Sequence, residues 1–225
     1  MMLVHVVNSS NSSLYANYLQ EMVKIRRHSI FDEIDDSLDF IEGVEFLLVF
    51  SKNGQLLEIS RFTPTQNTKC VSKGLANFIA EEVEFGPELW EHTKFVSDAT
   101  AETASLEKSN AYVTVGVLEW AMTKGIKRLV AVARKPFIDL AKQQTWPIRK
   151  IGPLVQYKPG LFAAAIEIKV SKRILDAARA FFGLNNTVTF TAPPPLDYRT
   201  ITIEQIRFLD AALEVNAGGE GQYYS

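Results

Sequence analysis

Apolar residues along the chain recur at two spacings, one typical of strands and one typical of helices. Short runs of alternating or continuous apolar residues predict strands at 3–7, 46–50, 55–62, 88–96, 128–133, 148–157 and 161–170. Apolar residues three and four positions apart predict helices at 14–31, 106–124, 136–144 and 172–182, and a short helix is expected after residue 76. Because strands and helices alternate along most of the chain, we expect an α/β fold around one mixed central sheet.

Glycine and polar residues mark the main turns. Asn53-Gly54 separates two strand-like runs and predicts a hairpin, since both residues accept a positive φ. Gly125 is placed to end the long central helix. The acidic segment 32–45 has no clear periodicity, so we expect a loop there.

The length of 225 residues fits one domain with a full core. After Gly183 the chain becomes rich in asparagine and proline, which favours a boundary at that point. We therefore expect a single domain at 1–184. A C-terminal extension at 185–225 would hold one helix, beginning near Thr202, and a frayed glycine-rich tail.

Composition and charge exclude several classes of protein. Hydrophobic residues make up 47% of the chain, yet no run of about 18 apolar residues could span a bilayer. The first residues show no basic leader or cleavage site, so we expect a cytoplasmic protein. Cys70 is the single cysteine and His5, His28 and His92 are far apart, so we expect neither a disulfide nor a metal site. The net charge of -2 gives no reason to expect a nucleic-acid partner.

Five short segments carry a more specific signal. In chain order they are Arg27-His28-Ser29-Ile30-Phe31, Asp36-Ser37-Leu38-Asp39, Arg61-Phe62-Thr63-Pro64-Thr65, Trp90-Glu91-His92-Thr93-Lys94-Phe95 and Trp146-Pro147-Ile148-Arg149-Lys150-Ile151-Gly152-Pro153. Their order and spacing resemble the acyl-homoserine-lactone synthases, whose motifs include Arg-Leu-Leu-Pro-Thr and Trp-Glu-x-Ser-Arg-Phe. The resemblance covers about residues 3–180 and implies the three-layer α-β-α fold of the Gcn5-related acetyltransferases. The chain departs from the family at Ser37, near a usual tryptophan, and at Lys94, which replaces arginine.

The resemblance also implies an activity and a set of site residues. Enzymes of this family join an acyl chain from a thioester to the amine of S-adenosylmethionine and then close the lactone of a quorum-sensing signal. S-adenosylmethionine would be a substrate, and no tightly bound cofactor is expected. The resemblance implies catalytic roles for Glu91, as the base that removes the amine proton, and for Lys94. The substrate-binding residues that it implies are Arg27, Phe31, Asp36, Asp39, Arg61 and Phe95.

Two of these assignments have a geometric or electrostatic alternative. In a regular strand Lys94 lies on the opposite face from Glu91, because side chains alternate, and a bulge would be needed to bring the two together. Asp36 and Asp39 can meet the positive charges of the substrate, or pair with arginines to order the acidic loop. The two roles of the aspartates are compatible.

An acyl chain needs an apolar channel. We expect the central sheet to open between the strand near Glu91 and the strand near Arg128, and the channel to occupy that gap. Apolar residues of the neighbouring helices would line it. The acyl-pocket residues that we expect are Trp120, Phe137 and Trp146.

The acyl donor is inferred from two segments, one that lacks glycine and one that is rich in basic residues. No glycine occurs between Phe95 and Val113, whereas a glycine-rich turn at a helix N-terminus is the usual site for the pyrophosphate of coenzyme A. The segment 134–158 has six basic residues and one acidic residue. We therefore expect acyl carrier protein as the partner, with acyl-CoA second, and docking of the acidic carrier at Arg149 and Lys150.

Two other functions remain open from the sequence. An N-acyl amino acid synthase of the same fold would use the same donor with a different amine, and the missing tryptophan and Lys94 keep this alternative open. A non-catalytic domain that binds a lipid or a partner is the other alternative. The presence of Glu91, of Arg27 and Arg61, and of the pair Asp36 and Asp39 argues against that second alternative.

Overall fold

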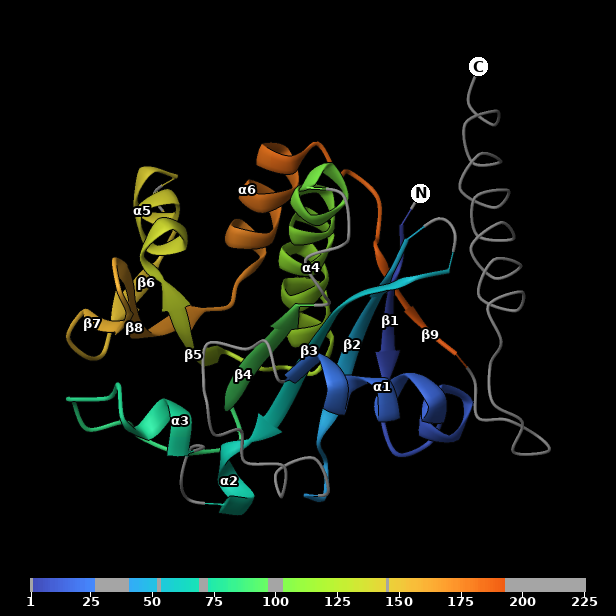
Figure 1. The fold of residues 1–225 in the computed structure, drawn as a ribbon, viewed down its shortest axis with the longest axis horizontal. Helices are drawn as coiled ribbons and strands as arrows, with labels where there is room; N and C mark the ends of the chain where they lie inside the picture. Colours follow the sequence, from blue (N-terminus) through green and yellow to red (C-terminus); the bar gives the residue numbers. More distant parts are fainter. Residues whose placement is uncertain are drawn as a thin grey trace.

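The computed structural model describes residues 2–26, 41–51, 54–68, 73–96, 103–144 and 146–192. Within these ranges the strands form one nine-stranded sheet (Figure 1). The strands are β1 (Val4–Val7), β2 (Glu45–Phe50), β3 (Leu56–Pro64), β4 (Leu89–Val96), β5 (Arg128–Arg134), β6 (Ile148–Lys150), β7 (Val155–Lys158), β8 (Leu161–Lys169) and β9 (Thr189–Thr191). The path of paired strands is β6-β8-β5-β4-β3-β2-β1-β9, and β7 also pairs with β8.

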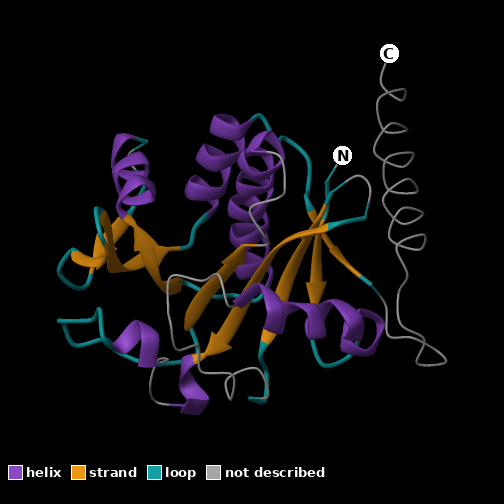
Figure 2. Ribbon diagram, viewed as in Figure 1, coloured by secondary structure: helices purple, strands orange, loops and turns teal. Residues whose placement is uncertain are grey.

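Helices lie on both sides of this sheet (Figure 2). They are the 3-10 helix η1 (Ser12–Tyr15), α1 (Ala16–Arg26), α2 (Thr65–Thr68), α3 (Lys73–Ala76), α4 (Thr103–Thr123), α5 (Lys135–Gln143) and α6 (Lys172–Phe182). Alternate residues of β2 define the two faces. Leu47 and Val49 pack in a cluster with α4 and α6, whereas Phe46, Leu48 and Phe50 pack with α1. The sheet is thus the middle of three layers, and the expected α-β-α fold is confirmed.

The sheet opens at its centre. β4 pairs with β3 from Trp90 to Val96, but it pairs with β5 only from Leu89 to Glu91. Beyond Glu91 and its partner Val130 the two strands diverge (Figure 1). The sequence predicts an opening at this place, and the strand pairing agrees with it.

Several helices follow the prediction closely. α6 has the expected bounds, and Gly183 ends it in the left-handed conformation with φ 67°. Gly125, just after α4, has φ 73°. None of the described helices is long and apolar enough to cross a membrane.

Two local predictions are wrong. The run at 148–157 is not one strand, because β6 ends before Gly152 and β7 begins after it. At this break Gly152 packs against the backbone of Phe78, since a Cβ there would lie 1.8 Å from the Phe78 carbonyl oxygen, and the carbonyl of Ile151 accepts hydrogen bonds from the N–H groups of Ala80 and Glu81. No helix follows residue 76, since α2 and α3 both precede that point and the described residues up to β4 form turns and coil.

The ninth strand is not predicted from the sequence. β9 pairs in parallel with β1, so the sheet continues past residue 184. Glu119 of α4 binds the start of this strand: its carboxylate accepts hydrogen bonds from the backbone N–H groups of Val188 and Thr189, both at 3.0 Å. Arg179 of α6 donates to the same carboxylate at 2.7 Å. The helix expected near Thr202 lies outside the described residues, and the boundary at 184 stays a prediction.

Candidate active site

Glu91 lies where β4 and β5 separate. It is the last residue of β4 that pairs with β5, and it stands opposite Thr63 on β3. Its side chain is buried, with 2% exposure. A carboxylate that loses water needs polar or charged neighbours, because burying an isolated charge is costly.

Those neighbours share one face of the sheet with Glu91. Directly opposite residues of an antiparallel pair lie on the same face, so Thr63 accompanies Glu91, and Arg61 accompanies Thr93. Arg61 and Thr63 are buried, with 1% and 3% exposure. The hydroxyl of Thr93 donates to Oε1 of Glu91 at 3.3 Å. This face therefore combines a carboxylate, a guanidinium and two hydroxyls.

The backbone of Lys94 and Phe95 belongs to β4. Lys94 stands opposite Ser60 and Phe95 opposite Ile59, in a register that has no bulge between Glu91 and Val96. The irregularity that would bring Lys94 to the face of Glu91 does not occur. The catalytic role of Lys94 and the binding role of Phe95 stay predictions.

The remaining substrate-binding candidates fall outside the described residues. These are Arg27, Phe31, Asp36 and Asp39, which belong to the segment between α1 and β2. Arg61 is the member of that predicted set whose side chain the structure describes. The charge network between the aspartates and the arginines stays a prediction.

The opposite face of the sheet carries the aromatic residues expected for the acyl pocket. Trp120 of α4 packs on Phe62, with ring centroids 4.0 Å apart, and meets the edge of Trp90 at 5.4 Å. Its indole N–H donates to Oε2 of Glu45 at 2.7 Å. Lys124 binds the other oxygen of Glu45 at 2.6 Å. The ring of Trp120 is therefore fixed by packing on one side and by a charged hydrogen bond on the other.

Phe137 and Trp146 join the same apolar cluster as Trp120. Their rings meet at an angle of 60° with centroids 6.3 Å apart. Trp120 and Trp146 are thus members of one large apolar cluster, and Phe137 packs against it. Their contact with an acyl chain stays a prediction.

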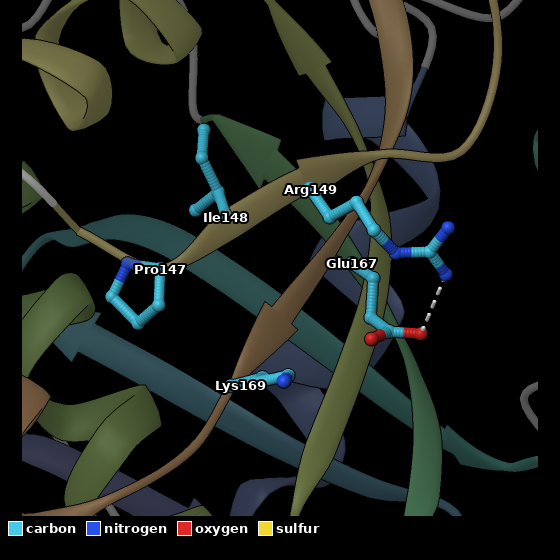
Figure 3. Close-up of a pocket in the computed structure, with 5 residues that line it drawn as sticks. All are labelled: Pro147, Ile148, Arg149, Glu167 and Lys169. Atoms are coloured by element: carbon cyan, nitrogen blue, oxygen red, sulfur yellow. Dashed lines mark hydrogen bonds and ion pairs between the residues drawn. The ribbon is translucent and has the colours of Figure 1, made fainter.

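Arg149 and Lys150, the predicted docking residues, lie on the edge strand β6 and are exposed. Arg149 forms ion pairs with Glu81 and Glu167, the second at 3.5 Å. Arg149 and Glu167 also line a cavity of about 220 Å³, together with Pro147, Ile148 and Lys169. Figure 3 shows the guanidinium of Arg149 turned toward the carboxylate of Glu167. Two carboxylates therefore offset the charge of Arg149, whereas Lys150 has no ion pair within the described part of the chain.

Several polar residues at this site are not predicted from the sequence. Thr63 faces Glu91 because of the strand register, and Glu45 reaches Trp120 across a long separation along the chain. On the face of Trp120, a hydrogen bond of 3.1 Å joins His92 to Ser60. The ring of His92 stacks on Phe62 at 4.8 Å. No local sequence pattern signals contacts of this kind.

Comparison with known proteins decides the family. Residues 10–172 match the family described as autoinducer synthase. The chain belongs to the autoinducer synthase family. Glu91, Arg61 and the three aromatic candidates all fall inside the matched region. No curated protein sequence matches the chain.

Solved structures of synthases share the fold of this family member. BjaI, described as a CoA-dependent acyl-homoserine lactone synthase, has a TM-score of 0.67 at 15% identity, over 88% of this chain and 97% of that one. MesI, also described as CoA-dependent, has a TM-score of 0.62 at 21% identity, over 83% and 98%. The synthase LasI has a TM-score of 0.62 at 14% identity, over 80% and 94%. One BjaI structure contains SAM and isopentyl-CoA, and another contains MTA.

Proposed function

We propose that this autoinducer synthase transfers an acyl group from a thioester to the amine of S-adenosylmethionine and then closes an N-acyl-homoserine lactone. In the first step the amine nitrogen attacks the thioester carbon, an amide bond forms and the thiol leaves. In the second step the carboxylate of the methionyl part attacks its own γ-carbon and displaces methylthioadenosine. Each step makes one bond and breaks one bond.

The observation that carries this proposal is the position of Glu91. A buried carboxylate at the fork of the sheet, beside a buried arginine, can accept the proton that the amine must lose before it attacks. Arg61 and the aspartates of the acidic segment would offset the charges of the zwitterionic substrate. The aromatic cluster around Trp120 on the other face supplies apolar surface for the acyl chain.

Analysis of the products tests this proposal directly. Purified protein with S-adenosylmethionine and an acyl thioester should yield an acyl-homoserine lactone and methylthioadenosine in equal amounts, both measured by mass spectrometry. Lactone formation without methylthioadenosine would contradict the second step. The absence of both products with every donor tested would contradict the proposal.

The identity of the acyl donor needs an experiment of its own. The sequence favours acyl carrier protein, through the missing glycines and the basic segment. The CoA-dependence of BjaI and MesI supports the other donor. The same acyl chain should therefore be offered on carrier protein and on coenzyme A, and the ratio of kcat/KM decides the donor.

A cytoplasmic location also stays a prediction.

An N-acyl amino acid synthase is the second candidate function. FeeM, described as an enzyme of that kind, has a TM-score of 0.50 at 17% identity. This activity would give an acyl amino acid and no methylthioadenosine. Supplying free amino acids in the product assay therefore separates the two candidates.

A further inference from the structure

The face that carries Glu91 contains a buried hydroxyl that the proposed reaction has not used. Thr63 is 3% exposed, and its Oγ1 has no hydrogen-bond partner among the described residues. Buried hydroxyls nearly always have a partner, because a hydroxyl that loses water without replacing it destabilises the fold. An unpaired buried hydroxyl at a candidate site indicates that a bound ligand supplies the missing hydrogen-bond partner.

The strand register places this hydroxyl beside the candidate base. Thr63 and Glu91 are directly opposite in the β3–β4 pair, and side chains at such positions have Cβ atoms about 4.5–5.5 Å apart. A ligand atom that bonds to Thr63 is therefore within reach of the Glu91 carboxylate. Thr93, the other threonine on this face, already donates to Glu91. Of the two hydroxyls, Thr63 is the one left for a substrate.

We propose that Thr63 is a substrate-binding residue whose hydroxyl oxygen accepts a hydrogen bond from the amino group of S-adenosylmethionine. This inference rests on the proposed function, in which the amine is the group that must meet Glu91. A contact to Thr63 fixes the amine beside the carboxylate that takes its proton. The family motif quoted above has leucine at this position, so the contact is one that this chain adds.

The proposal gives Thr63→Val a distinctive pair of effects. Valine has nearly the same shape and no hydroxyl, so it removes the hydrogen bond to the substrate. It also removes a buried polar group that has no partner in the free protein, which should raise the melting temperature. Affinity for the substrate and stability should therefore change in opposite directions.

Calorimetric titration with two ligands tests this. S-adenosylmethionine has the amino group, whereas methylthioadenosine lacks the whole amino-acid part. We expect T63V to bind S-adenosylmethionine about tenfold more weakly, the usual loss for a hydrogen bond to a charged group, and to bind methylthioadenosine as the wild type does. Thr63→Ser keeps the hydroxyl and should restore the affinity. Thr114→Val is the matched control, since the hydroxyl of Thr114 on α4 donates to the backbone oxygen of Asn110 within its own helix.

Other binding results contradict either the role of Thr63 or the proposed function. Equal affinity of T63V and wild type for S-adenosylmethionine means that the hydroxyl meets only water. Equal losses for both ligands mean a general disturbance of the site. If T63V does not fold, the pair Thr63→Ser and Thr63→Ala answers the same question. If the wild-type protein binds no S-adenosylmethionine, the proposed function itself is contradicted. If the wild type and T63V bind it equally well, only the role of Thr63 in substrate binding is excluded.

Discussion

The carboxylate of Glu91 is oriented by the protein before a substrate binds. The hydroxyl of Thr93 donates to its Oε1, and the pairing with both β3 and β5 fixes the backbone at this position. A base held in place loses little freedom when the amine arrives, which favours proton transfer in the correct geometry.

Glu91→Gln should separate binding from turnover. Glutamine keeps the shape of the side chain and cannot take the amine proton, so kcat should fall roughly a hundredfold or more while the affinity for S-adenosylmethionine changes little. Steady-state kinetics and calorimetry measure the two quantities. The exposed Glu82 offers the matched control, since Glu82→Gln should leave both unchanged. Loss of affinity with normal kcat at saturation would make Glu91 a ligand for the substrate and not a base.

Some residues of the site can be predicted from the sequence and others cannot, for a physical reason. Glu91 and Arg61 are recognisable because they belong to short motifs with a characteristic order. Thr63 lies within one of these motifs and Glu45 in none, but neither is recognisable as a site residue, because its neighbour lies across a strand pair or on a distant helix. Such contacts depend on register and packing, which a local pattern does not encode.

At the scale of elements, helices and strands that depend on a local pattern are predicted accurately, whereas those that depend on distant contacts are not. α6 is predicted with its bounds because it has one apolar face and ends at a glycine in the left-handed conformation. β9 has only three residues, and only its parallel pairing with β1 makes it a strand. The break between β6 and β7 coincides with the close approach of Gly152 to the carbonyl of Phe78, which is far away along the chain.

Gly152→Ala tests that close approach. The new Cβ would lie 1.8 Å from the carbonyl oxygen of Phe78, so the backbone must move. We expect the free energy of unfolding to fall by about 1–3 kcal/mol. Chemical denaturation measures the free energy of unfolding. Gly86→Ala is the control, because a Cβ there meets no atom within 4 Å. Equal stability of the two variants would show that the segment has room to shift.

Glu119→Gln tests the link between α4, α6 and β9. Its carboxylate accepts hydrogen bonds from the N–H groups of Val188 and Thr189, from the hydroxyl of Thr189 and from the guanidinium of Arg179. An amide NH₂ would face one of these donors, so we expect a loss of about 2–4 kcal/mol in the free energy of unfolding. Exchange of the amide protons of Val188 and Thr189 should accelerate more than exchange in β3. Unchanged protection at those two amides would contradict this role.

At the scale of the whole molecule, charge distribution bears on the choice of donor. The net charge of -2 is low, yet the segment 134–158 is basic. Arg149 already interacts with Glu81 and Glu167, so reversing its charge would place three carboxylates together and disturb the fold. Lys150 is exposed on the same strand and gives the cleaner test.

Lys150→Glu should raise the KM for acyl carrier protein several-fold at low salt. The increase should shrink at high salt, since charges more than about 10 Å apart are largely screened at 0.1 M ionic strength. Kinetics at two salt concentrations measure this. Lys172→Glu, the same charge change on α6, is the control. Wild-type KM values for K150E at low salt would exclude Lys150 from docking.

The pairing of β1 with β9 has a consequence for synthesis on the ribosome. Val4 emerges long before its partner Thr189, because most of the described chain lies between the two residues. Until then the outer edge of β1 has no strand beside it, and Glu119 lacks the backbone donors of β9. The nascent chain can assemble the antiparallel β1–β2–β3 portion early, whereas this edge of the sheet closes only after β9 has emerged. A ribosome that stalls before residue 188 therefore presents an open sheet edge to the chaperones that bind nascent chains.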